Sequence, residues 1–364
     1  MQTPTDLDGL RRRVQQAING QIAGGSTSLT EIGPEIAPLV GAVERLLTGG
    51  KGLRAGFLYW GYRAAGGADS DALVRLAASM EFFQGAALLH DDVMDRSDTR
   101  RGMPSAHRAV AALHEARGWE GDGDRFGEGA AILAGDLCLT WCDELYATCG
   151  LPAEELARGR HLFDAMRTQL MGGQFLDLLE SVRGWEGLDL EQRITSARKV
   201  IRFKSAKYTI EHPLRIGALV GGATGDDLEP LSDYGLSLGE AFQLRDDLLG
   251  VFGDPEATGK PAGDDLREGK RTVLIALALD AASPGDRVLV DSLLGRDDLD
   301  DAGVQAIRGV LRSTGAVERV EELIATLADD ARKAVGRARE GGRLDGSALD
   351  VLEALVDVST ARHA

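Results

Sequence analysis

The chain has 364 residues, of which 43% are hydrophobic and 27% charged, as in an ordinary globular protein. Its formal net charge of -17, from 58 acidic and 41 basic side chains, disfavours nucleic acid and anionic lipid as partners. Because no stretch reaches the ~20 consecutive apolar residues of a membrane span, and the N-terminus has no run of signal-peptide length, we expect a cytoplasmic protein. The three cysteines lack the spacing of a zinc site and indicate buried thiols in a reducing compartment.

Apolar residues recur at spacings of three and four almost throughout, which predicts an all-α fold. With no linker and no fixed-period repeat, we expect a single domain over residues 1–364. The polar stretch 96–104 and the Gly- and Asp-rich stretch 118–129 interrupt the helical pattern, and the second is expected to be a solvent loop. The helical patterns cover about 31–47, 51–65, 70–96, 129–148, 153–171, 190–222, 227–250 and 270–281, with more to the end.

The helical run that ends LLHDDVMD carries three aspartates. Successive residues of a helix turn by ~100°, so Asp91 and Asp95 lie ~40° apart and one turn along, with Asp92 beside them. Crowded carboxylates repel one another unless cations neutralise them. Hard oxygen ligands of this kind favour Mg²⁺, which is commonly bound by carboxylates together with substrate phosphates. The motif therefore indicates a diphosphate held through metal ions.

A second acidic pair ends another apolar helical stretch, EAFQLRDDLLGVFGDPEATGK. Asp246 and Asp247 occupy the same place at the end of this helical stretch as Asp91 and Asp92 in the first motif. Lys260 follows after a turn. Two helices that end in paired aspartates can face one another across a bundle and share several metal ions. Either pair alone is most often a solvated helix end, but two pairs, each followed by basic residues, favour a functional site.

Basic residues inside Gly-containing segments offer partners for such an anion. In TGGKGLRAG the glycines let the backbone approach an anion closely, and Lys51 and Arg54 fall on one face of the first turn of the next helix. They would clamp a diphosphate, the alternative being a helix start with exposed basic side chains. Arg100 and Arg101 are adjacent in a loop, so their side chains diverge and each could serve a different ligand.

The segment RFKSAKYT supplies a further basic residue. Lys204 lies one helical turn from Tyr208, and Ser205 beside it offers a hydroxyl toward a polar cavity. A solvated lysine is the alternative interpretation.

Four segments, GGKGLR, LLHDDVMDRSDTRRGMP, FKSAKYT and FQLRDDLLGVFGDPEATGK, together resemble the trans-isoprenyl diphosphate synthases, also called polyprenyl synthetases, in order, spacing and surrounding residues. The resemblance covers about residues 30–290 and looks closest to actinobacterial geranylgeranyl diphosphate synthases. It implies an all-helical bundle around a central cavity, usually a homodimer, with the acidic motifs near the mouth. It also implies a prenyltransferase that uses Mg²⁺, at about three ions per site.

The same resemblance implies a role for each motif residue. The metal ions would be bound by Asp91, Asp95 and Asp246, while Asp92 and Asp247 complete the two acidic motifs. Isopentenyl diphosphate would contact Lys51, Arg54, Gln84 and Arg101. The allylic diphosphate, which is dimethylallyl, geranyl or farnesyl diphosphate, would contact Arg100, Lys204 and Lys260, with Ser205 and Gln243 nearby.

Two positions depart from the family pattern. Gly250 stands where many relatives carry the last aspartate of the second motif, so one potential metal contact is lost. Gln84 stands where bacterial members often have histidine, and it keeps a hydrogen-bond donor and an acceptor.

Product length is expected to depend on the helix before Asp91, along which the growing tail runs. Ala86 and Ala87 are small where short-chain relatives place aromatic rings, whereas Phe83 lies two turns, ~11 Å, before Asp91. The tail can pass the alanines and is stopped by the phenylalanine, which predicts geranylgeranyl diphosphate (C20), with C15 or C25 as alternatives.

Two rival functions fit parts of the pattern. A class I terpene cyclase also ionises an allylic diphosphate with a magnesium-binding aspartate motif, but it does not need the second-substrate clamp of Lys51, Arg54 and Arg101. A non-catalytic regulatory subunit of a prenyl synthase would keep the fold, but the intact acidic motifs disfavour it.

Overall fold

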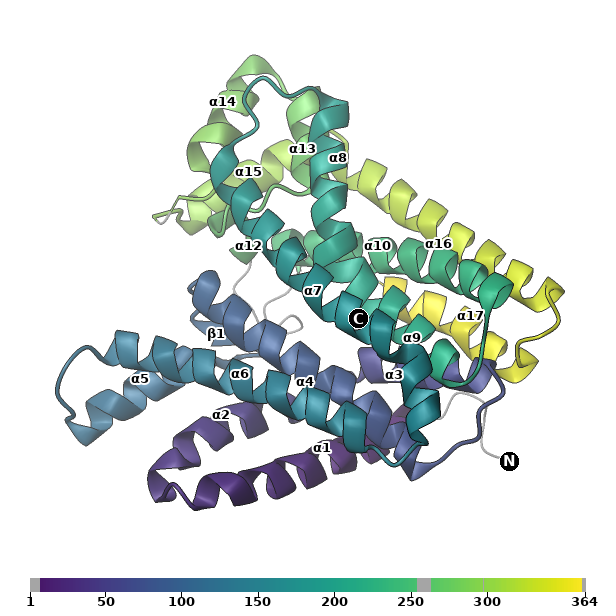
Figure 1. Ribbon diagram of the computed structural model, residues 1–364. Coiled ribbons are helices and arrows are strands. Elements are labelled where there is room, and N and C mark those ends of the chain that lie inside the picture. Colours follow the sequence, from purple (N-terminus) through teal and green to yellow (C-terminus); the bar gives the residue numbers. More distant parts are fainter. Residues whose placement is uncertain (1–6, 254–262, 297, 362–364) are drawn as a thin grey trace. The chain divides into compact units, whose positions relative to one another are not determined.

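The computed structural model describes residues 7–253, 263–296 and 298–361, and most of them lie in helices (Figure 1). This confirms the all-α prediction. The chain forms two compact units, each described by itself below. Unit 1 comprises Met1–Arg160 and Ile216–Gly222, and unit 2 comprises His161–Arg215 and Ala223–Ala364.

Unit 1 contains six helices that lie wholly within it among the described residues. Helix α4 packs against α6, α1, α3, α5 and α2, and Figure 1 shows it running along α6. A short antiparallel hairpin, β1 with β2, follows α4. The bounds are α1 (Leu7–Thr30), η1 (Pro34–Ile36), α2 (Ala37–Leu47), α3 (Leu53–Ala64), α4 (Asp71–Met94), β1 (Thr99–Arg100), β2 (Met103–Pro104), α5 (Ala106–Arg117) and α6 (Gly123–Thr148).

Helix α4 forms the centre of unit 1. The Ser70 side chain caps its first turn by accepting a hydrogen bond from the Leu73 N–H. By length and composition α4 could cross a membrane, but 72% of its most apolar window is buried inside the protein, as in the core helix of a globular unit. The cytoplasmic location stays a prediction.

In unit 2, helix α10 packs against the π-helix η2 and against α16 and α17, and α16 runs along it in Figure 1. Helices α7 and α9 have residues in both units. The bounds are α7 (Ala153–Arg183), α8 (Leu190–Val200), η2 (Ile201–Glu211), α9 (His212–Val220), η3 (Gly225–Asp227), α10 (Leu228–Phe252), α12 (Asp264–Arg267), α13 (Val273–Ala281), α14 (Pro284–Leu293), α15 (Asp301–Ser313), α16 (Ala316–Glu340) and α17 (Gly346–Thr360).

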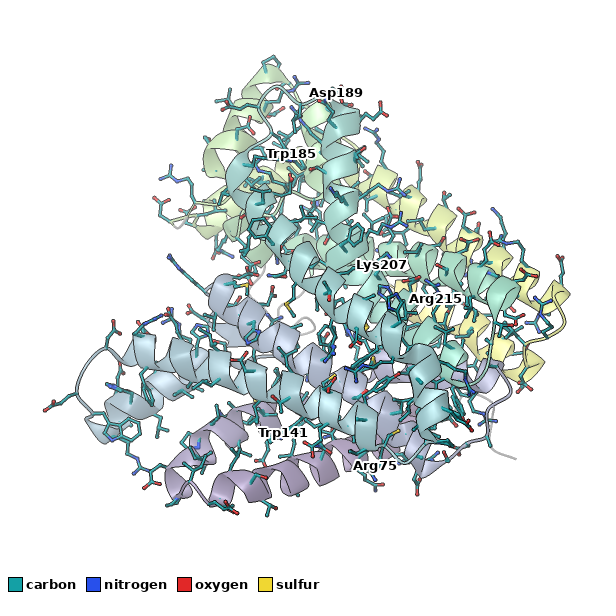
Figure 2. All side chains as sticks on the ribbon, viewed as in Figure 1. Arg75, Trp141, Trp185, Asp189, Lys207 and Arg215 are labelled. Carbon is teal, nitrogen blue, oxygen red and sulfur yellow. The ribbon has the colours of Figure 1, made fainter. Side chains whose placement is uncertain are left out.

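A hydrophobic core forms around α13, whose residues from Val273 to Leu279 are all buried. Trp185, in the turn between α7 and α8, packs into it and donates its indole N–H to Glu180 over 3.2 Å (Figure 2). Asp189 then starts α8 with a reciprocal capping box with Gln192.

Two stretches differ from the sequence prediction at the N-terminal side. Helix α1 was not among the predicted segments, although Leu10, Val14, Ile18 and Ile22 are buried at spacings of four. The stretch 118–129, expected to be a loop, is helical from Gly123, because Asp122 caps α6 by accepting from the Arg125 N–H. These expectations were wrong.

Further along the chain, the helix expected over 153–171 continues to Arg183. The helix expected over 190–222 exists, but its middle third, η2, is a π-helix. The sequence prediction treated this stretch as α-helix, because π-helical segments are rare and no residue type marks them.

Candidate functional site

The first acidic motif lies at the C-terminal end of α4. Asp91 and Asp92 belong to its last turn, and Asp95 is the C-cap, whose N–H donates to the Asp91 carbonyl over 2.8 Å. The Asp92 carboxylate is buried, whereas Asp91 and Asp95 are partly exposed. The three carboxylates therefore end one helix, as predicted, but Asp92 has a different environment from the other two.

Arg100 binds the buried carboxylate. Its Nε donates to Asp92 Oδ1 over 2.9 Å, its Nη2 also donates to that oxygen, and the same Nη2 lies 3.7 Å from Asp91 Oδ2. Arg100 ends β1, and the hairpin turns through Arg101 and Gly102, both with positive φ (54° and 72°), as a two-residue type I′ turn requires. Arg100 therefore binds the motif from the strand that follows α4.

Arg101 binds a different part of unit 1 from Arg100. Its Nη1 donates to the Leu46 carbonyl over 3.0 Å, at the end of α2. Burial lowers the pKa of Arg101, and the Glu81 carboxylate opposes that shift. The two adjacent arginines therefore diverge, one toward the aspartates and the other toward the α2–α3 connection.

The segment around Lys51 differs from the prediction. Gly49 (φ 78°) and Gly52 (φ 66°) are left-handed, so the backbone turns on both sides of Lys51, and α3 begins only at Leu53. Lys51 therefore precedes the helix and is exposed, while Arg54 lies in the first turn and is partly buried. The expectation that both lie on the first helical turn was wrong, because the left-handed Gly52 is the N-cap and the helix begins after it.

Glu81 is a residue that the sequence reasoning missed. It is 8% exposed on α4, and its Oε1 accepts from the Ala55 N–H over 3.1 Å, within the first turn of α3. A small hollow brings it together with the predicted residues Gln84 and Arg101; its lining is Leu46, Leu47, Gly50, Glu81, Gln84, Gly85, Leu88 and Arg101. The available signal was a glutamate at a core position of an apolar helix, because buried charge requires a partner.

The residues expected to set product length follow α4 toward its N-terminus. Phe83 and Ala86 are each 1% exposed, and Ala87 is partly exposed. Phe82 packs in a different direction, because its ring lies edge-on against Trp141 of α6 at 6.0 Å between centroids. Phe83, Ala87 and Asp91 recur at a spacing of four along one face.

In unit 2, the π-helix η2 carries Lys204 and Ser205. The Lys204 ammonium lies 2.5 Å from Asp177 Oδ2 on α7, a residue that the sequence reasoning did not single out. A π-turn widens the helix and is frequent at functional sites. Gly173 lets α7 approach η2 closely, because a Cβ there would meet the Phe203 carbonyl carbon at 2.5 Å.

Ser205 and Gln243 join η2 to the second acidic motif. The Ser205 hydroxyl donates to Gln243 Oε1, and Gln243 Nε2 donates to Asp247 Oδ1 over 2.8 Å. The structure thus connects two predicted substrate-binding residues and one predicted acidic residue through hydrogen bonds within one unit.

The two aspartates of the second motif differ in environment. Asp246 is exposed, whereas Asp247 is 6% exposed. Burial raises the pKa of Asp247 to about 8, with further contributions from the negative charges of Asp265 and Asp246, and the Gln243 hydrogen bond acts against the shift. Lys260, predicted to bind the allylic diphosphate, lies outside the described residues.

The family model described as polyprenyl synthetase matches residues 37–311 of this chain. The chain belongs to the polyprenyl synthetase family. A geranylfarnesyl diphosphate synthase of Aeropyrum pernix is 31% identical over 89% of this chain and 94% of its own length. A nonaprenyl diphosphate synthase of Mycobacterium tuberculosis is 31% identical over 86% and 84%.

A solved geranylgeranyl pyrophosphate synthase of Corynebacterium glutamicum, in complex with isoprenyl diphosphate and magnesium, superposes with a TM-score of 0.90 and 39% identity. It covers 98% of this chain and 99% of its own. These comparisons confirm the predicted family and the isoprenoid synthase fold, and this polyprenyl synthetase is a prenyltransferase. The relatives differ in the length of the product they are named for.

The residues of this polyprenyl synthetase fit a divalent cation by the chemistry of their donors. The end of α4 presents carboxylate oxygens, as does the end of α10, and Mg²⁺ prefers such ligands. At the first motif the Arg100 guanidinium lies near Asp91 Oδ2 and Asp92 Oδ1. Among residues 7–253, 263–296 and 298–361, no three His, Cys, Asp or Glu side chains gather as a metal-binding group.

Proposed function

We propose that this prenyltransferase condenses isopentenyl diphosphate with an allylic diphosphate to form geranylgeranyl diphosphate. The observation that supports the C20 product is the order of side chains along α4. Small residues, Ala87 and Ala86, stand before Asp91, and the buried ring of Phe83 stands one turn further. The similarity to the geranylgeranyl pyrophosphate synthase of Corynebacterium glutamicum supports the same length.

The allylic diphosphate is the ligand we assign to the acidic motifs. Asp91, Asp95 and Asp246 would hold about three Mg²⁺ ions, which would supply positive charge to the leaving diphosphate. The additional diphosphate contacts would come from Arg100, Lys204 and Lys260. The first two now bind carboxylates, Asp92 and Asp177, so their cationic heads are already oriented by hydrogen bonds.

Isopentenyl diphosphate is the ligand we assign to the basic residues of the α2–α3 connection and α4, namely Lys51, Arg54, Gln84 and Arg101. The carbonyl of Leu46 and the charge of Glu81 hold Arg101 in place, so little side-chain entropy is lost when it binds an anion.

In the reaction, the C1–O bond of the allylic substrate breaks and its electron pair leaves with diphosphate. The double bond of isopentenyl diphosphate attacks the allylic carbon, and the proton released from the product goes to the departed diphosphate. The side chains bind, orient and stabilise charge, and the mechanism requires no protein nucleophile. Ser205 and Gln243 would keep Asp247 hydrogen-bonded beside Asp246.

The deciding experiment incubates the purified chain alone with Mg²⁺, isopentenyl diphosphate and farnesyl diphosphate. We expect geranylgeranyl diphosphate by product chromatography. Cyclic hydrocarbon and free diphosphate would instead indicate a class I terpene cyclase, and no turnover in metal-replete buffer would indicate a regulatory subunit. Light scattering of the same sample tests the homodimer that we propose from the family pattern.

A further inference from the structure

Helix α1 packs against α2, α3 and α4 in unit 1, and two of its polar side chains bind the segment that joins α2 to α3. Arg11 Nη2 donates to the Gly49 carbonyl over 3.1 Å. Gln15 Oε1 accepts from the Gly49 N–H over 3.3 Å. Arg11 and Gln15 are four residues apart and share one face of α1, so this face holds both backbone polar groups of Gly49.

The same segment lies between Arg11 and Arg101. A Cβ built on Gly50 would lie 3.6 Å from Arg101 Nη2, and a Cβ built on Gly52 would lie 4.0 Å from Arg11 Cγ. Arg101 is therefore close to the residue before Lys51, and the stem of Arg11 is close to the residue after it. Two arginines from different elements thus flank the lysine to which we assign isopentenyl diphosphate.

No carboxylate of the described residues forms an ion pair with Arg11. Arg13, two residues further along α1, differs in this respect, because it pairs with Asp69 at 2.9 Å and with Asp71 at 3.2 Å. The Arg11 side chain is exposed, and it uses one of its five N–H donors on the Gly49 carbonyl. Its charge and its other donors can therefore bind an anion from solution.

The charge of Arg11 also acts on Arg101. Burial lowers the pKa of Arg101, the Glu81 carboxylate opposes that shift, and the charges of Arg100, Arg54 and Arg11 lower the pKa further. Like charges that lie close enough to affect one another are stabilised when an anion binds among them. Arg11 therefore belongs to the same group of cations as the residues to which we assign isopentenyl diphosphate.

We propose that Arg11 is a further binding residue for isopentenyl diphosphate, donating to its diphosphate together with Lys51 and Arg101, and that Gln15 is a positioning residue that holds the Gly49 backbone. The inference rests on the proposed function, which assigns this substrate to Lys51 and Arg101. A diphosphate has oxygens for several donors, and a guanidinium can bind two of them at once. Helix α1 then contributes to the substrate site, although it precedes residues 37–311, which the family model matches.

A purely structural role is the alternative for Arg11. Gly49 follows the C-cap of α2, and a cation that binds a carbonyl near a helix C-terminus stabilises that end of the helix. In that case the loss of Arg11 lowers the stability of the protein and leaves its affinity for isopentenyl diphosphate unchanged. The experiment must therefore measure stability and affinity separately.

The test compares Arg11→Gln, Arg11→Lys and Gln15→Ala with the wild type. Arg12→Gln is the matched control, because Arg12 is an exposed neighbour on α1 and the substitution changes the charge by the same amount. For each protein we would measure the Tm, the Kd of isopentenyl diphosphate by calorimetry in EDTA, and the steady-state constants with Mg²⁺. The steady-state assay gives kcat and separate KM values for isopentenyl diphosphate and farnesyl diphosphate.

We expect Arg11→Gln to raise the Kd and the KM of isopentenyl diphosphate by about 5-fold to 20-fold, the effect of losing a charge-assisted hydrogen bond at an exposed site. The KM of farnesyl diphosphate stays at the wild-type value. Arg11→Lys keeps the charge and recovers part of the affinity. Gln15→Ala raises the KM of isopentenyl diphosphate by about 2-fold to 5-fold without changing kcat, and Arg12→Gln matches the wild type.

Two results would overturn the role of Arg11. If Arg11→Gln has a lower Tm but binds isopentenyl diphosphate as the wild type does, Arg11 only stabilises the end of α2. If Arg12→Gln weakens binding equally, the effect comes from net charge and not from a contact. A wild-type protein that binds no isopentenyl diphosphate in the calorimeter would instead refute the proposed function, and this inference with it.

Discussion

Two buried carboxylates of unit 1 are each held by a donor from a second element of that unit. Asp92 binds Arg100 from the hairpin after α4, and Glu81 accepts from the Ala55 N–H of α3. A carboxylate without water is stable only when such donors replace the lost solvent. These contacts therefore fix the geometry of the neighbouring motif residues before any substrate binds.

The Glu81 contact can be tested on stability. Glu81→Ala leaves the buried Ala55 N–H without its acceptor, and we expect it to lower the free energy of unfolding by about 1–3 kcal/mol. Glu81→Gln keeps an acceptor oxygen, so it should lower the free energy of unfolding by less. Urea unfolding measures both variants. Equal losses of stability would show that the charge of Glu81, rather than its hydrogen bond, stabilises the protein.

The product-length residues give a second prediction. Ala87→Phe should shorten the product, because a ring would stand one turn before Asp91, and Phe83→Ala should lengthen it. Chromatography of the products measures this. Phe82→Ala is the control: it removes an equally buried ring that packs on Trp141, so it should destabilise the protein by about 3–5 kcal/mol without changing product length. Unchanged lengths in both test variants would contradict the proposal.

The buried His212 is expected to make the stability of the protein depend on pH. Burial lowers its pKa to about 4, with Lys207 and Arg215 acting in the same direction and Glu211 against it (Figure 2). The unfolded chain thus takes up a proton below pH ~6.5 that the folded protein does not, and stability falls as the pH drops from there toward 4. We expect His212→Gln to reduce the stability lost between pH 7 and pH 5 by about 2 kcal/mol, measured by urea unfolding. An unchanged pH dependence of stability in the variant would contradict this prediction.

At the scale of elements, unit 2 is organised around α10. Gly235 and Gly239 lie one turn apart and let η2 approach, since added Cβ atoms would lie 2.5 Å from the Glu211 Cα and 2.6 Å from the Ala206 Cα. At its other end, Arg245 forms two 2.7 Å hydrogen bonds with Glu321 of α16 and donates to the Thr360 carbonyl of α17. The C-terminal helices, which lack a catalytic pattern of their own, therefore hold the helix that carries the second motif.

The close approach of η2 and α10 is testable. Gly239→Ala should force the π-helix that carries Lys204 away from α10, and we expect a loss of about 1–3 kcal/mol together with slower prenyl transfer. Thermal unfolding and a steady-state assay measure the two effects. Gly336→Ala on α16 has nothing within 4 Å of the added Cβ and should be neutral or stabilising. Similar losses in both variants would point to a general effect of added side chains.

At the scale of the whole molecule, each unit has its own buried apolar side chains. We therefore expect EDTA to abolish prenyl transfer and added Mg²⁺ to restore it, while the helical signal in circular dichroism stays the same. Activity that survives the chelator would contradict the assigned role of the aspartates. The single catalytic domain over residues 1–364 and the homodimer stay predictions.

The sequence by itself determined the all-α class, the family and the two acidic motifs, because helical periodicity and motif spacing are local properties of the chain. The family resemblance also grouped Gln84 with Arg101, and Ser205 with Gln243, as substrate-binding residues, and that role stays a prediction. The tertiary structure decided what depends on contacts between distant segments. These are the hydrogen bond from α3 to Glu81 and the contact between Lys204 and Asp177. It also showed that α3 begins only after Lys51. It also showed that a Cβ added at Gly250 would lie 1.9 Å from Asp265 Oδ2, since only packing shows which side chains from distant segments meet.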